Sequence, residues 1–197
     1  WKMDGGDEVT ADEILKRALR FKPYWGKDGG ITISGGEPLL QIDFVIELFK
    51  KAKELGINTC IDTAGNPFTN EELMKYTDLL LLDLKEINPA RHKDLTGFDN
   101  SNIIEMAKYL SEINKPVWIR HVLVPEHSDF DEDLDALGDF IDTLSNVDRV
   151  EILPYHTLGK FKWENLGIPY TLESISPPSA ERIENAKQRI HAGIRKQ

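Results

Sequence analysis

Thiols are nearly absent from this sequence, whose 197 residues include a single cysteine, Cys60. One thiol excludes an internal disulfide framework, and it excludes a zinc or iron–sulfur site built only from cysteines of this chain. We expect Cys60 itself to be a small buried apolar residue.

Long apolar runs and a basic surplus are also missing. No run approaches the roughly 20 residues that span a bilayer, and no apolar stretch opens the chain as a signal peptide would. The 34 acidic and 24 basic residues give a net charge of −10, which argues against a nucleic-acid partner. We expect one cytoplasmic domain over residues 1–197, with no membrane or nucleic-acid partner.

Short apolar runs and amphipathic stretches alternate along the chain. The runs suit buried parallel strands and fall at residues 30–34, 57–63, 79–84, 117–124 and 150–153. Helical stripes separate them, the last running from Ile183 to Ile194, and Thr10 and Thr69 each open a capping-box pattern. This alternation predicts an α/β fold with a parallel sheet, either doubly wound or closed as a barrel. Residues 1–7 read as loop and a helix precedes the first strand, so we expect the first strand of the domain to be missing.

Polar residues follow or interrupt every predicted strand, and parallel α/β proteins carry their sites at the carboxyl ends of strands. The five segments are Ser34-Gly35-Gly36-Glu37-Pro38, Asp62-Thr63-Ala64-Gly65, Asp83-Leu84-Lys85, Trp118-Ile119-Arg120-His121 and Leu153-Pro154-Tyr155-His156. Each has an ordinary structural explanation, such as a tight turn, a cap or an ion pair. Their coincidence at one edge favours a functional site.

Two chemistries remain open from the residues alone. Asp62 and Thr63 offer oxygen ligands to a hard cation. Lys85, if desolvated, suits a Schiff-base lyase with Glu37 or Asp83 as its acid–base partner.

Taken together and in order, these segments resemble the pyruvate formate-lyase activating enzymes, a radical S-adenosylmethionine (SAM) family that activates glycyl-radical enzymes. The segment Leu158-Gly159-Lys160 with Lys162-Trp163 extends the resemblance. It implies a partial (β/α) TIM-like barrel that binds SAM. It also implies a [4Fe–4S] cluster that reduces SAM to a 5′-deoxyadenosyl radical, which generates a glycyl radical on pyruvate formate-lyase. The implied electron donor is a flavodoxin or ferredoxin.

The resemblance also implies roles for individual residues. Gly35, Gly36 and Glu37 would hold the methionyl amino group, and Asp83, Lys85 and His156 the rest of the methionine and the ribose side. Arg120 would lie beside the cofactor or the incoming glycine loop. Asp62, Thr63 and Asp83 would bind a monovalent cation; no residue of this chain is assigned a certain catalytic role.

One departure from the family concerns the cluster. The family carries a C-x-x-x-C-x-x-C motif shortly before the segment that Trp1 begins, and this sequence has no such cysteines. We therefore expect the longer protein from which this chain derives to hold the cluster, and this chain alone to be inactive. The alternatives are the Lys85 lyase and a non-catalytic cofactor-binding module.

Overall fold

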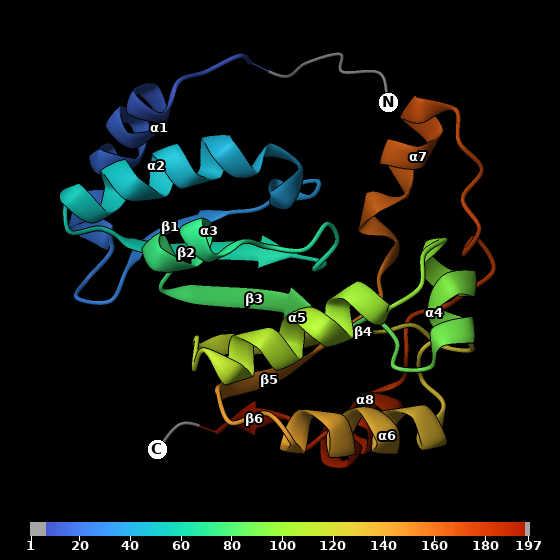
Figure 1. Ribbon diagram of the computed structural model, residues 1–197. Helices are drawn as coiled ribbons and strands as arrows, with labels where there is room; N and C mark the ends of the chain where they lie inside the picture. Colours follow the sequence, from blue (N-terminus) through green and yellow to red (C-terminus); the bar gives the residue numbers. More distant parts are fainter. Residues whose placement is uncertain (1–6, 196–197) are drawn as a thin grey trace.

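The computed structural model describes residues 7–195, whose strands form a six-stranded sheet (Figure 1). The strands are β1 (Gly30–Ile33), β2 (Asn58–Thr63), β3 (Leu79–Asp83), β4 (Val117–Leu123), β5 (Val147–Pro154) and β6 (Gly193–Ile194). They are ordered in space as they are in the chain, and β1 to β5 are parallel. A doubly wound sheet reverses its strand order at a switch point, whereas a barrel steps in one direction. The order therefore selects the partial barrel from the two predicted architectures.

Helices precede the first strand and connect each strand to the next. They are α1 (Ala11–Ala18), α2 (Ile42–Glu54), α3 (Glu71–Tyr76), α4 (Pro89–Thr96), α5 (Ser101–Glu112), α6 (Asp131–Asp142), α7 (Lys160–Leu166) and α8 (Ala180–Arg189), with 3₁₀ turns η1 (Leu19–Tyr24), η2 (Pro38–Gln41) and η3 (Thr157–Gly159). In Figure 1, α4 and α7 lie at the end to which the strand arrows point. Across residues 7–195, no helix combines the length and the apolarity that a membrane crossing requires.

The two faces of the sheet differ in burial. Residues that alternate along a strand point to opposite faces, and paired residues of parallel neighbours point to the same face. Ile61, Leu82 and Ile119 are fully buried on the face that joins the hydrophobic core with the helices. Asp83 and Arg120 belong to the other face, where their side chains are partly exposed. The sequence thus places its charged strand residues on the more open face.

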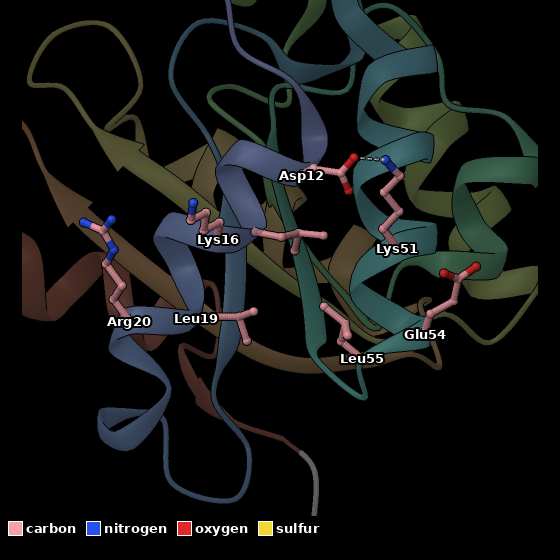
Figure 2. Close-up of a pocket in the computed structure, with 8 residues that line it drawn as sticks. Asp12, Lys16, Leu19, Arg20, Lys51, Glu54 and Leu55 are labelled. Carbon is pink, nitrogen blue, oxygen red and sulfur yellow. Dashed lines mark hydrogen bonds and ion pairs between the residues drawn. The ribbon is translucent and has the colours of Figure 1, made fainter.

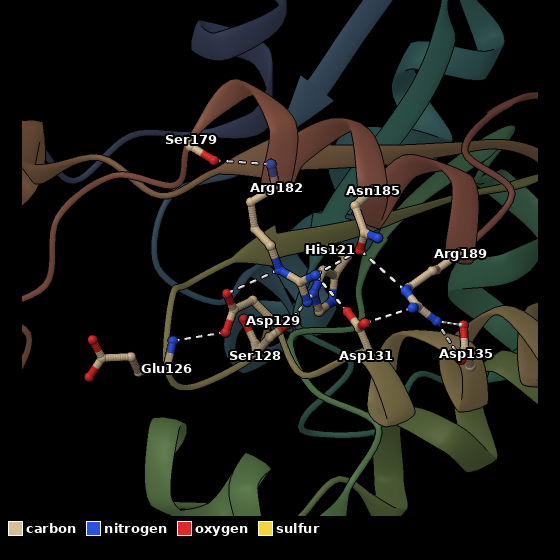
Figure 3. A network of polar contacts seen from close by, with 10 residues as sticks. All are labelled: His121, Glu126, Ser128, Asp129, Asp131, Asp135, Ser179, Arg182, Asn185 and Arg189. Atoms are coloured by element: carbon tan, nitrogen blue, oxygen red, sulfur yellow. Dashed lines mark hydrogen bonds and ion pairs between the residues drawn. The ribbon is translucent and has the colours of Figure 1, made fainter.

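An ion-pair network joins the last two long helices. Arg182 and Arg189 of α8 both contact Asp131, which begins α6, and Arg182 also contacts Asp129 while Arg189 contacts Asp135 (Figure 3). These five residues are called the helix cluster below. The network fixes α8 on α6 at the surface of the molecule.

Three expectations about the elements need correction. Ile194 ends no helix: α8 stops at Arg189, and β6 begins at Gly193, whose φ of 147° few other residues adopt. The N-cap of α3 is Asn70 and not Thr69, although Thr10 forms the predicted capping box. For the long connection from Leu158 to Pro178 the sequence pattern predicts a packed surface loop, but the structure has the exposed helix α7 there. The loop predicted for residues 1–7 lies outside the described part of the chain, except for Asp7.

Candidate functional site

Three predicted site residues meet at the carboxyl edge of the sheet. Arg120 of β4 lies between Asp83 of β3 and Asp62 of β2, and we call these three residues the strand cluster. The Arg120 Nε and Nη2 atoms donate to Asp83 Oδ1 at 3.1 and 2.8 Å, and Nη2 also donates to Asp62 Oδ1. Asp83 and Arg120 are partners in the register of β3 and β4, so the strand pairing itself brings their side chains together.

The electrostatics of the strand cluster are unbalanced. Two carboxylates share one guanidinium, and all three side chains are between 16% and 23% exposed. Burial raises the pKa of the Asp62 carboxyl, and Asp83 adds to the rise although Arg120 and Lys85 oppose it. Burial lowers the pKa of Arg120, but the two carboxylates outweigh it and hold that pKa above its ordinary value. A carboxylate that ionises reluctantly beside a fixed cation is typical of a ligand site.

The turn after β1 reaches the same edge. Gly35 and Gly36 have φ values of 85° and 62°, in the left-handed region that favours glycine. A Cβ atom at either position would meet no other atom within 4 Å, so open space borders this turn.

The carboxylate of Glu37 accepts three hydrogen bonds from the protein itself. Its Oε1 accepts from Leu39 N at 3.0 Å and from the Thr63 hydroxyl at 2.7 Å, and its Oε2 accepts from Ala64 N at 2.9 Å. The carboxylate therefore joins the turn after β1 to the turn after β2. A carboxylate has about four lone-pair sites, so one remains for a ligand ammonium.

Thr63 does not join the predicted cation ligands through its side chain. It follows Asp62 on β2, so its side chain points to the buried face, where it is 2% exposed. Its hydroxyl donates to Glu37 and accepts from Gly65 N at 2.9 Å. Asp62 and Asp83 do lie together, with Arg120 as the cation between them.

The two remaining predicted residues lie at the same edge. Lys85 is half-buried two residues beyond Asp83, near enough to Asp62 to lower the pKa of its carboxyl. His156 is exposed two residues beyond the end of β5.

Sequence reasoning did not select two buried groups that each follow a predicted site residue. Glu86 follows Lys85 and is 1% exposed; burial raises the pKa of its carboxyl to about 7, and within residues 7–195 its Oε2 has no hydrogen-bond partner. His121 follows Arg120, is also 1% exposed, and contacts two backbone carbonyls. The signal available in both cases was a titratable residue that directly follows a site residue in the sequence.

Two hollows lie away from this edge. A groove of about 670 Å³ runs between α1 and α2, where Leu19 and Leu55 line it together with the ion pair of Asp12 and Lys51 (Figure 2). A second hollow of about 450 Å³ includes Cys60, which is half-buried and not fully buried as expected. Neither hollow is lined by a predicted cofactor-binding residue.

Comparison with known proteins identifies the family. The sequence pattern of the Radical SAM superfamily matches residues 1–141. The pyruvate formate-lyase-activating enzyme of Streptococcus mutans is 56% identical over 96% of this chain and 75% of its own length. That of Staphylococcus epidermidis is 49% identical over 97% of this chain and 80% of its own. The chain belongs to the pyruvate formate-lyase-activating enzymes of the radical SAM superfamily.

Solved structures agree with this family assignment. A domain of the pyruvate-formate lyase-activating enzyme from Bacteroides vulgatus has a TM-score of 0.68 and 25% identity, covering 82% of this chain and 92% of that one. SuiB from Streptococcus suis, solved with S-adenosylmethionine, has a TM-score of 0.61 and 24% identity over 77% of this chain and 35% of that one. The radical SAM α/β fold is thus common to this chain and to both structures.

The radical SAM family implies SAM and a [4Fe–4S] cluster. The residues of this chain fit SAM but do not fit the cluster. SAM carries an ammonium, a carboxylate and a sulfonium, and the edge supplies carboxylates, two cationic side chains and open space beside Gly35 and Gly36. This donor set fits SAM. The cluster needs several thiolates, and one cysteine in 197 residues does not fit it.

Proposed function

We propose that this chain is the SAM-binding part of an activating enzyme that generates a glycyl radical on pyruvate formate-lyase. The observation that carries the proposal is the 56% identity with the Streptococcus mutans enzyme along 96% of the chain. The strand cluster supports it, because three strands deliver charges of both signs to one edge.

Each residue at this edge would hold a different group of SAM. Glu37, with the turn at Gly35 and Gly36, would hold the ammonium group through the lone pair that its three protein contacts leave over. Lys85 and Arg120 would face the carboxylate of SAM. Bound SAM supplies the radical precursor; the residues of this chain orient it and balance its charges.

Asp83 and His156 would complete the site on the methionine and ribose side. Asp83 is held in place by two hydrogen bonds from Arg120, so its position is set before a ligand arrives. Preorganised charges of this kind lose little entropy on binding.

The site would also bind a monovalent cation, and the enzyme would receive electrons from a donor protein. The cation would join Asp62 and Asp83, adding to the charge that Arg120 supplies, with Thr63 contributing through its backbone oxygen. The electron donor would be a flavodoxin or a ferredoxin, as the resemblance to the family implies.

The central test is the affinity of this chain for SAM, measured by calorimetry in potassium chloride. We expect Asp83→Asn to weaken binding at least tenfold, about 1.4 kcal/mol, because it removes one of the preorganised charges. Asp135→Asn, the same change in the helix cluster, should leave affinity unaltered. Absence of binding to the parent chain, or equal effects of the two variants, would contradict the cofactor site.

The same titration tests the cation. Replacing potassium with a bulky organic cation should weaken SAM binding by the parent chain and have less effect on Asp62→Asn. If affinity ignores both the ion and the substitution, the cation assignment is wrong.

The partner surface is proposed on α7. This helix lies at the carboxyl end of the strands (Figure 1), and it exposes Phe161 and Trp163, which are 55% and 40% accessible. Exposed aromatic side chains are frequent in interfaces.

Replacing both aromatic residues tests this surface. We expect Phe161→Ala with Trp163→Ala to weaken the binding of pyruvate formate-lyase roughly tenfold, measured by surface plasmon resonance. Tyr24→Ala is the control, because Tyr24 is 85% exposed on η1 and away from α7. Equal binding by the parent, the double variant and the control would remove α7 from the interface.

A further inference from the structure

His121 occupies an unusual position directly beneath the strand cluster. It follows Arg120 on β4, points to the opposite face and is 1% exposed. Its Nδ1 lies 2.8 Å from the carbonyl oxygen of Leu84, and its Nε2 lies 2.9 Å from that of Ser128. Figure 3 shows the ring together with the loop that contains Ser128. One side chain thus contacts the ends of two separate segments.

The first segment is the end of β3. Backbone pairing of β3 with β4 reaches Asp83 opposite Arg120, and the Leu84 amide then donates to the Arg120 carbonyl at 2.9 Å. The next group along is the Leu84 carbonyl, which His121 contacts. Because Leu84 lies between Asp83 and Lys85, this contact continues the pairing of the strands into the segment that carries both site residues.

The second segment is the loop between β4 and α6. The Ser128 hydroxyl donates to the Val122 carbonyl at 2.7 Å and accepts from the Val124 amide at 2.9 Å. The next residue, Asp129, accepts from the Glu126 amide at 2.8 Å and pairs with Arg182 of the helix cluster. The loop is therefore fixed at the point where His121 meets it.

We infer that His121 is a positioning residue, which holds the Asp83–Lys85 segment against the fixed loop and so sets the geometry of the strand cluster. The inference rests on the proposed function for its effect on SAM. The contact itself does not depend on that function.

The chemistry of the ring suits this role. Burial lowers the pKa of the His121 imidazole, and its contacts with the carbonyls of Leu84 and Ser128 oppose that shift. A neutral ring donates to one of the two carbonyls at a time and a protonated ring donates to both, whereas an apolar residue of similar size can donate to neither. A buried carbonyl that loses its only side-chain donor becomes a source of local opening.

Three variants test the inference. His121→Phe removes both ring nitrogens at similar volume, and His121→Gln keeps an N–H donor. Ile119→Val is the control, because Ile119 is fully buried on the same face of β4 and makes only apolar contacts with its side chain.

Hydrogen exchange is the first measurement, since it needs no ligand. We expect His121→Phe to speed exchange at the Leu84 and Val124 amides about tenfold or more, with partial recovery in His121→Gln and little change in Ile119→Val. Unchanged exchange at both amides in His121→Phe would overturn the inference. Should that variant fail to fold, His121→Asn, whose shorter amide cannot span both carbonyls, takes its place with the same expected pattern.

SAM affinity is the second measurement. We expect the dissociation constant to rise roughly tenfold in His121→Phe, less in His121→Gln, and by under about twofold in Ile119→Val. Parent-level affinity in His121→Phe would overturn the positioning role. If the parent chain does not bind SAM, the proposed function fails at its cofactor site, and the exchange rates still decide whether His121 holds the two segments together.

Discussion

The strand cluster and the helix cluster use the same two residue types for different ends. In the strand cluster one arginine serves two aspartates that come from neighbouring strands, and all three side chains are at most 23% exposed. In the helix cluster two arginines serve three aspartates, of which Asp131 and Asp135 are 48% and 55% exposed and Asp129 is 17% exposed. Each cluster has one more aspartate than arginine, but the first places that negative charge on the more open face of the sheet, between neighbouring strands. The second is a surface contact that docks one helix on another.

The carboxyl pKa values record this difference. Burial raises the pKa of Asp62 despite its contact with Arg120. The hydrogen bond from Arg182 lowers the pKa of Asp131. A lowered carboxyl pKa means that folding favours the charged form, whereas a raised one means that folding opposes it. The helix cluster therefore contributes to stability, while the strand cluster keeps charge at a cost, as ligand sites often do.

Removing the arginine of each cluster should have the largest effect. We expect Arg120→Met to lower the free energy of unfolding by about 3 kcal/mol, because Asp62 and Asp83 are left together without a cation. It should also abolish measurable SAM binding. Arg182→Met should cost about 1 kcal/mol, as partly exposed pairs do, and preserve binding. Urea denaturation and calorimetry measure both quantities, and equal costs for the two variants would contradict the distinction.

Glu86, which belongs to neither cluster, provides the next largest effect. Its pKa rises from 4.5 to about 7, so the folded protein keeps a proton that the unfolded chain releases. The folded state binds more protons between these values, and stability must therefore fall as pH rises from 4.5 through about 7. We expect Glu86→Gln to remove this fall and to be more stable than the parent by roughly 2 kcal/mol at about pH 8. Urea denaturation at about pH 5 and pH 8 measures it; parallel pH profiles would show that Glu86 ionises normally.

The fold was largely predictable because its signal is local. The strands at residues 57–63 and 79–84 are short apolar runs buried in a parallel sheet, and they recur at nearly the predicted bounds. The order of the strands, which decides between a barrel and a doubly wound sheet, depends on tertiary packing that no local pattern records. Short β6 was missed for a similar reason: Ile194 fits the apolar stripe of α8, but the helix ends at Arg189 and the backbone turns away at His191, whose φ is 51°.

The edge of the sheet at which the site lies was predictable from the sequence, but the contacts of its individual side chains were not. Alternation along β3 and β4 places Asp83 and Arg120 on one face, and both side chains meet there. The same alternation, applied to β2, separates Thr63 from Asp62, which the cation hypothesis had grouped together. The resemblance could not reveal that Glu37 already receives three protein donors, since that depends on how two turns pack together.

The smallest expected effect gives the sharpest comparison, because its sign differs between the clusters. The pKa of Asp62 is raised, so its ionisation costs stability as pH rises through its folded pKa. The free energy of unfolding of Asp62→Asn should therefore equal that of the parent at about pH 7 or exceed it by up to about 0.5 kcal/mol. The pKa of Asp131 is lowered, so its charge stabilises the fold above its unfolded pKa, and that contribution is lost as pH falls. Asp131→Asn should therefore be less stable than the parent at about pH 7, with the difference shrinking toward about pH 3. Thermal unfolding at about pH 3, 5 and 7 follows both variants. If both differences have the same sign at neutral pH, the two clusters do not differ in the way that their environments imply.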